Sequence, residues 1–278
     1  MYEDFLASFD LRREEPNTRG AIEFQIRDGV GVVAMSNEGS RNALTLSMWQ
    51  QLEDVFHRLG QVQDLRVVVL RGAGTREFAA GADISEFPEN RFDSAQAFRY
   101  NGQLSRTLRA VASIEIPTIA MIRGFAVGGG CELASACDLH IGADDAQMGI
   151  PIGRLGVTLG LTESKLLLRQ VGVSGLKRIL FTGELFDAVN SLRLGLLDEV
   201  IPAERLARRI SAILTSIVGS SAITMSAAKV VTDLSSELKE DTADRVNQFL
   251  FDAYDGPDLR EGVQAFLEKR PPTFPERG

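Results

Sequence analysis

The chain has 278 residues, of which 44% are hydrophobic and 24% charged, and its formal net charge at neutral pH is -8. This length and composition predict a soluble globular protein with one sizeable domain and an appended piece, or two small domains. The net charge argues against nonspecific nucleic-acid binding, which needs a basic face, but it allows a local basic pocket for a phosphate-bearing ligand.

Cysteine and histidine are rare and dispersed. Cys131 and Cys137 with His57 and His140 cannot build a disulfide framework or a four-ligand zinc site, so we expect buried cysteines and no metal. No apolar run approaches the length of a membrane span. Residues 1–20 are too acidic for a transit peptide and lack the apolar centre of a signal peptide. We therefore expect a cytoplasmic protein that does not bind membranes.

The first 60 residues predict an arm, a hairpin and a helix. Residues 1–20 are mixed and charged, which is typical of a loosely held arm. Apolar and polar residues alternate over residues 22–26 and 30–34, and Asp28-Gly29 between them favours a β-hairpin turn. Thr45 can cap the next helix, in which large apolar residues recur at helical spacing at Trp49, Leu52, Phe56 and Leu59.

The central part alternates strands, small-residue loops and helices. A buried strand at residues 67–70 leads into a loop that ends in Phe78–Ile84. An irregular linker at residues 87–93 then precedes a predicted helix at residues 94–114. A second strand at residues 117–122 leads into a glycine loop. This repetition is compatible with a doubly wound α/β sheet.

The glycine loop is the most informative stretch. Glycines at residues 128–130 remove every Cβ, so that a ligand can approach the backbone closely. The helix predicted to follow leaves N–H groups without partners, and its dipole favours negative charge nearby. Glu132 lies in its first turn, where a carboxylate either complements the dipole or transfers a proton. N–H groups that hold an oxyanion beside such a carboxylate suit enolate chemistry.

The loop after the first strand is a candidate partner for the glycine loop. Gly72 and Gly74 begin like a dinucleotide-binding fingerprint, but Glu77 stands where the third glycine should be, so the fingerprint fails. Two small-residue loops after two strands can instead each supply one N–H group to a shared oxyanion hole.

The C-terminal part begins with a short strand at residues 138–143, in which His140 reads as a core histidine. A turn-rich loop at residues 149–156 follows, and Thr162 is the expected cap of the next helix. From residue 203 the pattern is almost wholly helical. Its first apolar stripe consists of Leu206, Ile210, Ile213 and Ile217.

Two motifs in this order, Phe78–Ile84 and Gly128–Ala134, resemble the enoyl-CoA hydratase/isomerase (crotonase) superfamily, and the resemblance extends from about Ile22 to Phe274. It implies an α/β fold built as a spiral of repeated ββα units. It also implies a division into an arm (1–20), a spiral core (21–202) and a C-terminal helical region (203–278). That last region would mediate oligomerisation into a homotrimer or a dimer of trimers.

The resemblance assigns roles at the site. The backbone N–H groups of Ala82 and Gly129 would bind the carbonyl oxygen of a CoA thioester, and Glu132 would be one of two glutamates that activate water. Coenzyme A would enter as part of the substrate, with no tightly bound cofactor. The residues expected to contact CoA are Arg41, Ala43, Ala80, Ile84 and, from another subunit, Lys269.

One position departs from the hydratase pattern. The second glutamate of the hydratases directly follows a proline, and here Pro151 is followed by Ile152, which cannot transfer a proton. Either Glu132 works alone, or another group takes the role, or the reaction needs no second acid. The candidate substitutes are Arg154, Glu163, Asp83, Glu86 and Tyr100.

Each substitute has a plainer interpretation. Arg154 can bind a carboxylate on the substrate or lie on the surface. Glu163 can be an acid or only a helix-start carboxylate. We expect an acyl-CoA enzyme of the hydratase/isomerase type. The alternatives are a decarboxylase or hydrolase of a branched or cyclic acyl-CoA, and a scaffold that binds CoA esters without chemistry.

Overall fold

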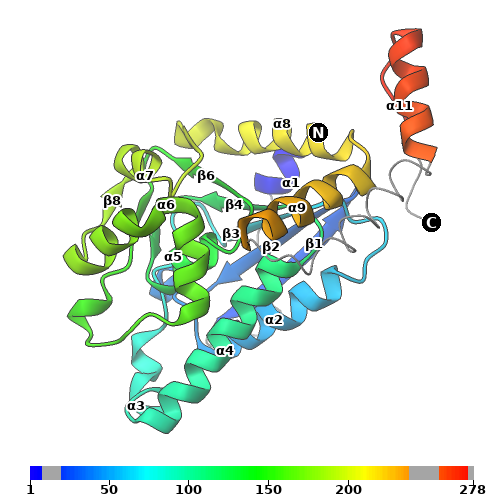
Figure 1. The fold of residues 1–278 in the computed structure, drawn as a ribbon. Helices are drawn as coiled ribbons and strands as arrows, with labels where there is room; N and C mark the ends of the chain where they lie inside the picture. The colour runs from blue at the N-terminus through cyan, green and yellow to red at the C-terminus, as the bar shows by residue number, and fades with distance from the viewer. Residues whose placement is uncertain (8–19, 238–256, 275–278) are drawn as a thin grey trace.

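The fold is described from a computed structural model, in which residues 1–7, 20–237 and 257–274 are described. Helices and strands alternate along most of this chain (Figure 1). The strands are β1 (Ala21–Arg27), β2 (Val30–Ser36), β3 (Val67–Gly72), β4 (Thr118–Ile122), β5 (Phe125–Val127), β6 (Leu139–Ala143), β7 (Gln147–Gly149), β8 (Phe186–Asp187) and β9 (Glu199–Ile201). The helices are α1 (Glu3–Ala7), α2 (Leu46–Leu59), α3 (Phe87–Asn90), α4 (Ser94–Ser113), α5 (Gly129–Ala134), α6 (Leu161–Thr182), α7 (Ala188–Leu194), α8 (Leu206–Val218), α9 (Ala222–Glu237) and α11 (Pro257–Glu268).

Local chemistry explains where the first elements begin and turn. Strands β1 and β2 form the predicted hairpin. Asp28 and Gly29, the two residues of its loop, have φ angles of 49° and 75°, and positive φ at both positions is what a type I′ turn requires. Thr45 caps α2 by accepting a hydrogen bond from the N–H of Met48. Asp93 and Gln96 form a capping box at the start of α4. The predicted hairpin and the predicted cap at Thr45 are confirmed, whereas the capping box of α4 was not predicted.

The large sheet has the strand order β1-β2-β3-β4-β6-β9, and every pair after the first is parallel. Strands β2, β3 and β4 are buried along their whole length, as the continuous apolar sequence of a two-sided parallel sheet requires. A doubly wound sheet would reverse its strand order at an interior point. Here each later strand adds to the same edge, so the chain winds in one direction and the predicted spiral is confirmed.

A second sheet, with the order β5-β7-β8, was not predicted from the sequence. Its strands have three, three and two residues. Such short strands within glycine-containing loops show no alternation that could identify them. This sheet begins directly before the glycine loop, and its β5 also forms a bridge between Ala79 and Ala126. It therefore holds the two sequence motifs together.

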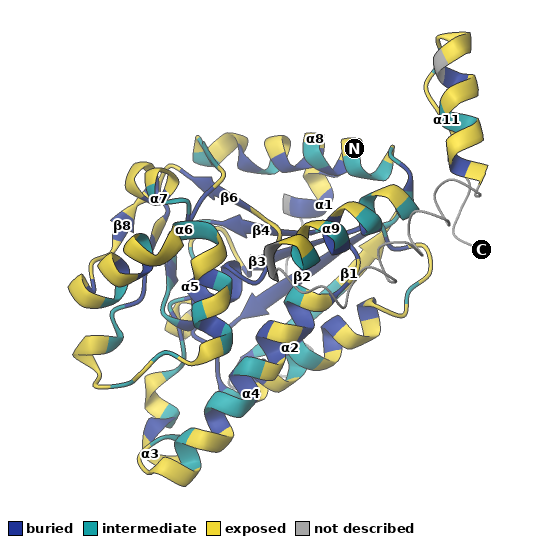
Figure 2. Ribbon diagram, in the orientation of Figure 1, coloured by how far each residue is buried: buried dark blue, intermediate teal, exposed yellow. Residues whose placement is uncertain are grey.

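Helices cover both faces of the large sheet (Figures 1 and 2). Met48, Trp49 and Phe56 of α2 and Leu108 of α4 pack in the larger core against one face. On the other face, α1 and α8 pack in a second core that includes Val32 and Val69. Figure 2 shows the strands of the large sheet as buried and the outer faces of the covering helices as exposed.

The two ends of the described chain modify the expected domain division. The start of the arm is not loosely held, because Tyr2, Phe5 and Leu6 are buried in the second core against α8. The spacing of these three residues was a signal of a short amphipathic helix. Helix α8 buries Leu206 and Ile210 of the predicted stripe, together with Leu214, against the sheet of its own chain, while Ile213 and Ile217 are partly buried. In contrast, α11 stands apart from the body in Figure 1.

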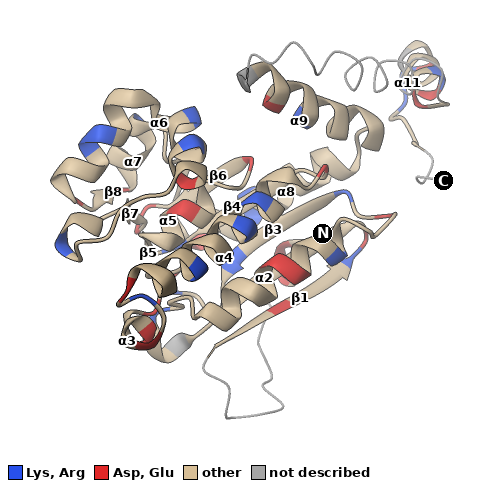
Figure 3. Ribbon diagram, turned by 60° about the horizontal axis from the view of Figure 1, so that its bottom comes forward, with Lys and Arg blue, Asp and Glu red and all other residues tan. Residues whose placement is uncertain are grey.

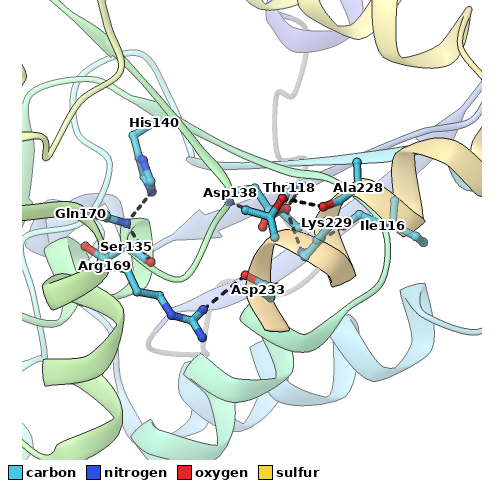
Figure 4. A network of polar contacts seen from close by, with 11 residues as sticks. Ile116, Thr118, Ser135, Asp138, His140, Arg169, Gln170, Ala228, Lys229 and Asp233 are labelled. Carbon is cyan, nitrogen blue, oxygen red and sulfur yellow. Dashed lines mark hydrogen bonds and ion pairs between the residues drawn. The ribbon is translucent and has the colours of Figure 1, made fainter. Parts of the chain in front are cut away.

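Helix α9 is fastened to the body by an ion pair between the buried Lys229 and the more exposed Asp138 (Figure 4). The Nζ atom of Lys229 lies 2.8 Å from Oδ2 of Asp138 and donates to the carbonyl oxygen of Ile116 at 3.3 Å. Within the described residues, no single helix is long and apolar enough to span a membrane, although α8 and α9 pass that test as a pair bent by 105°.

Candidate active site

The two sequence motifs and the start of α6 surround one cavity of about 270 Å³. The walls come from the loop after β3, from the glycine loop after β5, and from the segment between β7 and α6. Of the residues predicted to form the site, the cavity brings together Ala80, Ala82, Ile84, Gly129, Glu132, Ile152, Arg154 and Glu163. The structure thus brings together eight predicted residues that are spread from residue 80 to residue 163 of the sequence.

Backbone hydrogen bonds tie the first loop to its neighbours. The N–H of Ala79 donates to Phe125 at 2.8 Å, and the N–H of Val127 donates back to Ala79 at 3.0 Å. Further along, the N–H of Leu44 donates to Gly81 and the N–H of Asp83 donates to Leu44. In such a parallel bridge the intervening residue, Ala82, turns its own N–H to the other side. That side is the cavity.

The N–H groups of Ala82 and Gly129 lie close together and are free to donate. A Cβ placed on Gly129 would lie 3.6 Å from the nitrogen of Ala82. Gly129 is the first residue of α5, so its N–H has no partner inside the helix. Among the described residues, no hydrogen-bond acceptor is found for either group. The cavity therefore contains two adjacent backbone donors that a ligand oxygen can occupy.

Glycine is required where these loops meet. Gly128 and Gly81 have φ angles of 52° and 105°, in the left-handed region that disfavours other residues. A Cβ on Gly130 would lie only 2.2 Å from the carbonyl oxygen of Ala79. The glycine run thus permits the close approach of the two loops that sets the donor pair.

Glu132 is the charged residue of the short helix α5. Figure 3 shows an acidic position in red on this helix. The Glu132 side chain lines the cavity, yet the residue is only 6% exposed. Burial is the main reason that its pKa is raised from 4.5 to about 8, with a further increase from the charge of Glu163 and a decrease from Arg91. A carboxyl group that exchanges a proton near neutral pH is suited to acid–base catalysis.

Glu163 lies in the first turn of α6 and is 3% exposed. Its Oε1 accepts a hydrogen bond of 2.8 Å from the hydroxyl of Ser105 on α4, whereas its buried Oε2 has no hydrogen-bond partner. The expected cap at Thr162 is wrong, because α6 begins at Leu161 with Gly160 as its N-cap. A Cβ on Gly160 would lie 2.2 Å from Oε2, so the glycine leaves the space that this carboxylate fills.

Three of the proposed substitutes for the missing glutamate have structural roles. Asp83 caps a 3-10 turn by accepting from the N–H and hydroxyl of Ser85. Glu86 accepts from the N–H of Leu46 at the start of α2 at 2.7 Å. Tyr100 is buried, its hydroxyl accepts from Nε1 of Trp49, and burial raises its pKa to about 12. None of these three side chains lines the cavity.

The segment from residue 152 to residue 155 supplies an apolar and a basic side chain. Ile152 lines the cavity and packs against the larger core. Arg154, in the same 3-10 turn, is exposed at the cavity. The position where a second glutamate was sought is therefore within the cavity and is apolar.

Sequence reasoning missed Arg91 and Ser105. Arg91 was placed in an irregular linker, but it lines the cavity, lies 4.9 Å and 4.7 Å from the ring centroids of Phe87 and Tyr100, and donates to Asn101. The flanking aromatic residues were a signal of this cation–π site. Ser105 gave no signal, because its partner Glu163 is 58 residues away.

The residues predicted to contact CoA are only partly assembled by one chain. Arg41 is exposed near the cavity loops, with its guanidinium 5.2 Å from the ring centroid of Phe125. Ala43 is buried, and Ile84 is exposed at the cavity. Lys269 directly follows α11, which lies far from α5 and α6 in Figure 1, the two helices whose first turns line the cavity. No contact joins Lys269 to this site within the described residues.

Comparison with known proteins decides the family. A family model described as enoyl-CoA hydratase/isomerase matches residues 25–277, nearly the whole chain. The chain belongs to the enoyl-CoA hydratase/isomerase family. It is therefore an acyl-CoA enzyme of this family, and the sequence resemblance is confirmed.

Individual members of this family match over most of their length. A Mycobacterium tuberculosis protein named "Probable enoyl-CoA hydratase" is 33% identical over 249 residues, which cover 89% of this chain and 95% of the relative. The short-chain-enoyl-CoA hydratase of Clostridium acetobutylicum is 31% identical, covering 87% and 92%. A solved enoyl-CoA hydratase/carnithine racemase from Magnetospirillum magneticum has a TM-score of 0.86 and 31% identity, covering 91% and 95%.

Proposed function

We propose that the protein adds water to the double bond of a 2-enoyl-CoA thioester. The observation that carries the proposal is the buried carboxyl of Glu132 in one cavity with two adjacent backbone donors that have no acceptor. The names of relatives such as the short-chain-enoyl-CoA hydratase support the same reaction.

The proposed mechanism begins at the thioester oxygen. The N–H groups of Ala82 and Gly129 hold this oxygen while negative charge develops on it, and such donors typically contribute about 100- to 1000-fold in rate each. Glu132 transfers a proton in the same step. Its raised pKa, about 8, lets this carboxyl exist in both protonation states near neutral pH.

We propose that CoA lies across the outer mouth of the cavity. Arg41 meets a phosphate, and Ala43, Ala80 and Ile84 contact the rest of the CoA group. Lys269 would reach a phosphate bound to a neighbouring subunit, since α11, which it follows, stands apart from the body of its own chain. We propose a homotrimer or a dimer of trimers, located in the cytoplasm, in which α8 packs on the sheet of its own chain and α11 contacts a neighbour.

A second candidate reaction is decarboxylation of a β-carboxylated acyl-CoA. It is favoured by the two arginines that line the cavity, Arg91 and Arg154, since guanidinium groups bind carboxylates in a paired geometry. In that reaction the donor pair would stabilise the enolate left when carbon dioxide departs. Hydration is the preferred proposal because the cavity also contains buried carboxyls.

The test is a spectrophotometric assay of the wild type and two variants with a panel of 2-enoyl-CoA esters. We expect hydration to remove the conjugated enoyl-thioester absorbance, and Glu132→Gln to abolish this loss. Glu53→Gln is the matched control, because Glu53 is a part-buried glutamate outside the cavity that accepts from Gln103. If the wild-type protein binds CoA esters but removes the absorbance of none of them, the hydration proposal is overturned. Carbon dioxide release from a β-carboxylated ester would then select the second candidate, and its absence a binding scaffold.

A further inference from the structure

Glu163 has the surroundings of a residue that acts on a ligand. Its side chain lines the cavity and is 3% exposed, and one carboxylate oxygen, Oε2, is buried without a hydrogen-bond partner. A buried carboxylate oxygen without a donor lowers the stability of the folded protein, because the hydration lost on burial is not replaced. A substrate or a water molecule in the cavity can supply the missing donor.

A purely structural role at the helix start does not explain this geometry. A glutamate three residues after the N-cap usually turns back to accept the N–H of the N-cap residue. Here that residue is Gly160, whose missing side chain provides room for Oε2. Oε2 nonetheless accepts no hydrogen bond, and Oε1 is held by Ser105 of α4. The carboxylate is therefore oriented by a contact between two helices.

Glu163 is also electrostatically coupled to Glu132. Both carboxyls line one cavity, and the charge of Glu163 is one cause of the raised pKa of Glu132. Arg91, which lowers that pKa, is a cation of the same cavity and is positioned by Phe87 and Tyr100. Two like charges in a buried site favour a state in which one carboxyl is protonated and the other ionised.

The position of Glu163 resolves the departure seen at Ile152. Both residues line the cavity, but they come from different elements, the 3-10 turn at Ile152–Arg154 and the first turn of α6. We propose that Glu163 is the second carboxylate of the active site and that α6, rather than the loop after Pro151, supplies it to work with Glu132 on the added water. This inference rests on the proposed hydration reaction.

The proposed step balances without any further reactant. The oxygen of water forms a bond to Cβ of the enoyl group as the carbon–carbon π bond breaks. One proton of the water passes to the ionised carboxyl of the pair, and the protonated carboxyl delivers its proton to Cα. The thioester oxygen carries the transient charge between the N–H groups of Ala82 and Gly129. The pair ends with one proton, as it began.

The experiment compares Glu163→Gln and Glu163→Asp with the wild type and with the control Glu53→Gln. Steady-state hydration gives kcat and KM. Infrared difference spectroscopy of the free protein follows the carbonyl band of a protonated carboxyl as pH rises, and Glu132→Gln identifies the band of Glu132. Glu163→Gln preserves shape and the capacity to accept from Ser105. Glu163→Asp preserves the charge at the helix start but withdraws the carboxylate from the cavity.

We expect Glu163→Gln to lower kcat by about 100-fold or more, as removal of a general acid or base does, with little change in KM. The thermal midpoint should be no lower than that of the wild type, because an unpaired buried charge is removed. Glu163→Asp should also lose activity, since a correct distance is needed. The carbonyl band of Glu132 should titrate at lower pH in Glu163→Gln than in the wild type, and its titration should be unchanged in Glu53→Gln. Retention of more than about one tenth of kcat in Glu163→Gln would overturn the inference. Full activity of Glu163→Asp would do the same, because a helix-start role needs only the charge.

The infrared titration separates this inference from the proposed function. If the wild type hydrates no ester, hydration is overturned and the titration alone decides whether the two carboxyls form a pair. A lower pKa of Glu132 in Glu163→Gln then supports the pair. An unchanged titration overturns it.

Discussion

Two groups of buried charge in this molecule differ in how their polar atoms are satisfied. Lys229 on α9 is paired with Asp138, which also accepts hydrogen bonds of 2.7 Å and 2.8 Å from the N–H and hydroxyl of Thr118 (Figure 4). In the cavity, Glu132 and Glu163 are like charges, and Oε2 of Glu163 has no partner. The first group fastens a helix to the sheet.

The difference shows that burial of a charge is not in itself a sign of function. A buried charge such as that of Lys229, which has both an ion-pair partner and a hydrogen-bond acceptor, can serve structure alone. A buried carboxylate that lacks a donor and faces a like charge lowers the free energy of unfolding, so its retention calls for a functional explanation. The predictions below test this contrast from the largest expected effect to the smallest.

The first prediction concerns stability and pH. The pKa of Glu132 is about 8 in the folded protein and 4.5 for the unperturbed group, so the folded state binds more protons between these values. Stability should therefore be highest below pH 4.5 with respect to this group and fall as pH rises to about 8, by on the order of 5 kcal/mol at most. Glu132→Gln should remove this dependence and make the protein more stable at pH 8. Urea unfolding at several pH values checks it, and a variant less stable than wild type at pH 8 would contradict it.

The second prediction breaks the satisfied ion pair. Lys229→Met removes the ion pair and leaves the carbonyl oxygen of Ile116 without this buried donor, so the free energy of unfolding should fall by about 2 kcal/mol while kcat is preserved. Arg205→Met is the matched control, because its pair with Glu204 is 73% exposed on both sides and should contribute under about 1 kcal/mol. Chemical denaturation and the hydration assay measure both. A large loss of kcat in the folded Lys229→Met protein would refute the assignment of a structural role.

The third prediction displaces the unsatisfied carboxylate without removing it. Gly160 has φ and ψ angles of -80° and 173°, which alanine also adopts, but the new Cβ would occupy the place of Oε2. Gly160→Ala should lower kcat by about 10- to 100-fold with little loss of stability. Gly153→Ala is a control in the same segment, since nothing lies within 4 Å of its added Cβ. Equal kcat values for the two variants would show that the carboxylate position does not matter.

The smallest expected effect is that of Ser105→Ala. The hydroxyl donates to Oε1 of Glu163 at 2.8 Å, and its loss should cost about 1 kcal/mol of orientation, or roughly a fivefold lower kcat. KM should stay close to that of the wild type, because Ser105 itself does not line the cavity. Thr107→Ala provides a comparison on the same helix, where the hydroxyl donates to Trp49 outside the cavity. A kcat equal to that of the wild type would argue against a positioning role for Ser105.

Local patterns were sufficient to predict much of the fold. The Asp28-Gly29 turn, the Thr45 cap and the buried sequences of β3 and β4 all depend on interactions within a few residues, and each is confirmed. The two loop motifs also led to Ala82, Gly129 and Glu132 as residues of one cavity. The alternative of a doubly wound sheet could not be excluded by such patterns, because strand order depends on contacts between distant segments.

The choice among the candidate substitutes for the missing glutamate could not be made from the sequence, because it depends on long-range contacts. Asp83, Glu86 and Tyr100 were as plausible as Glu163 until their hydrogen-bond partners were known. What distinguishes Glu163 is the combination of burial, a donor on α4 and an oxygen without a partner. None of these properties is contained in a first-turn glutamate as such.

The order of the strands has a consequence for synthesis of the chain. Because each later strand adds to the same free edge of the large sheet, the sheet can grow in the order in which the polypeptide leaves the ribosome. Both loops of the donor pair and Glu132 are present once β4 and α5 have emerged, whereas Glu163 and the packing of α8 follow later. A nascent chain halted after α5 would therefore contain both loops of the donor pair and Glu132. The remaining side of the cavity, with Glu163, would form only when α6 is added.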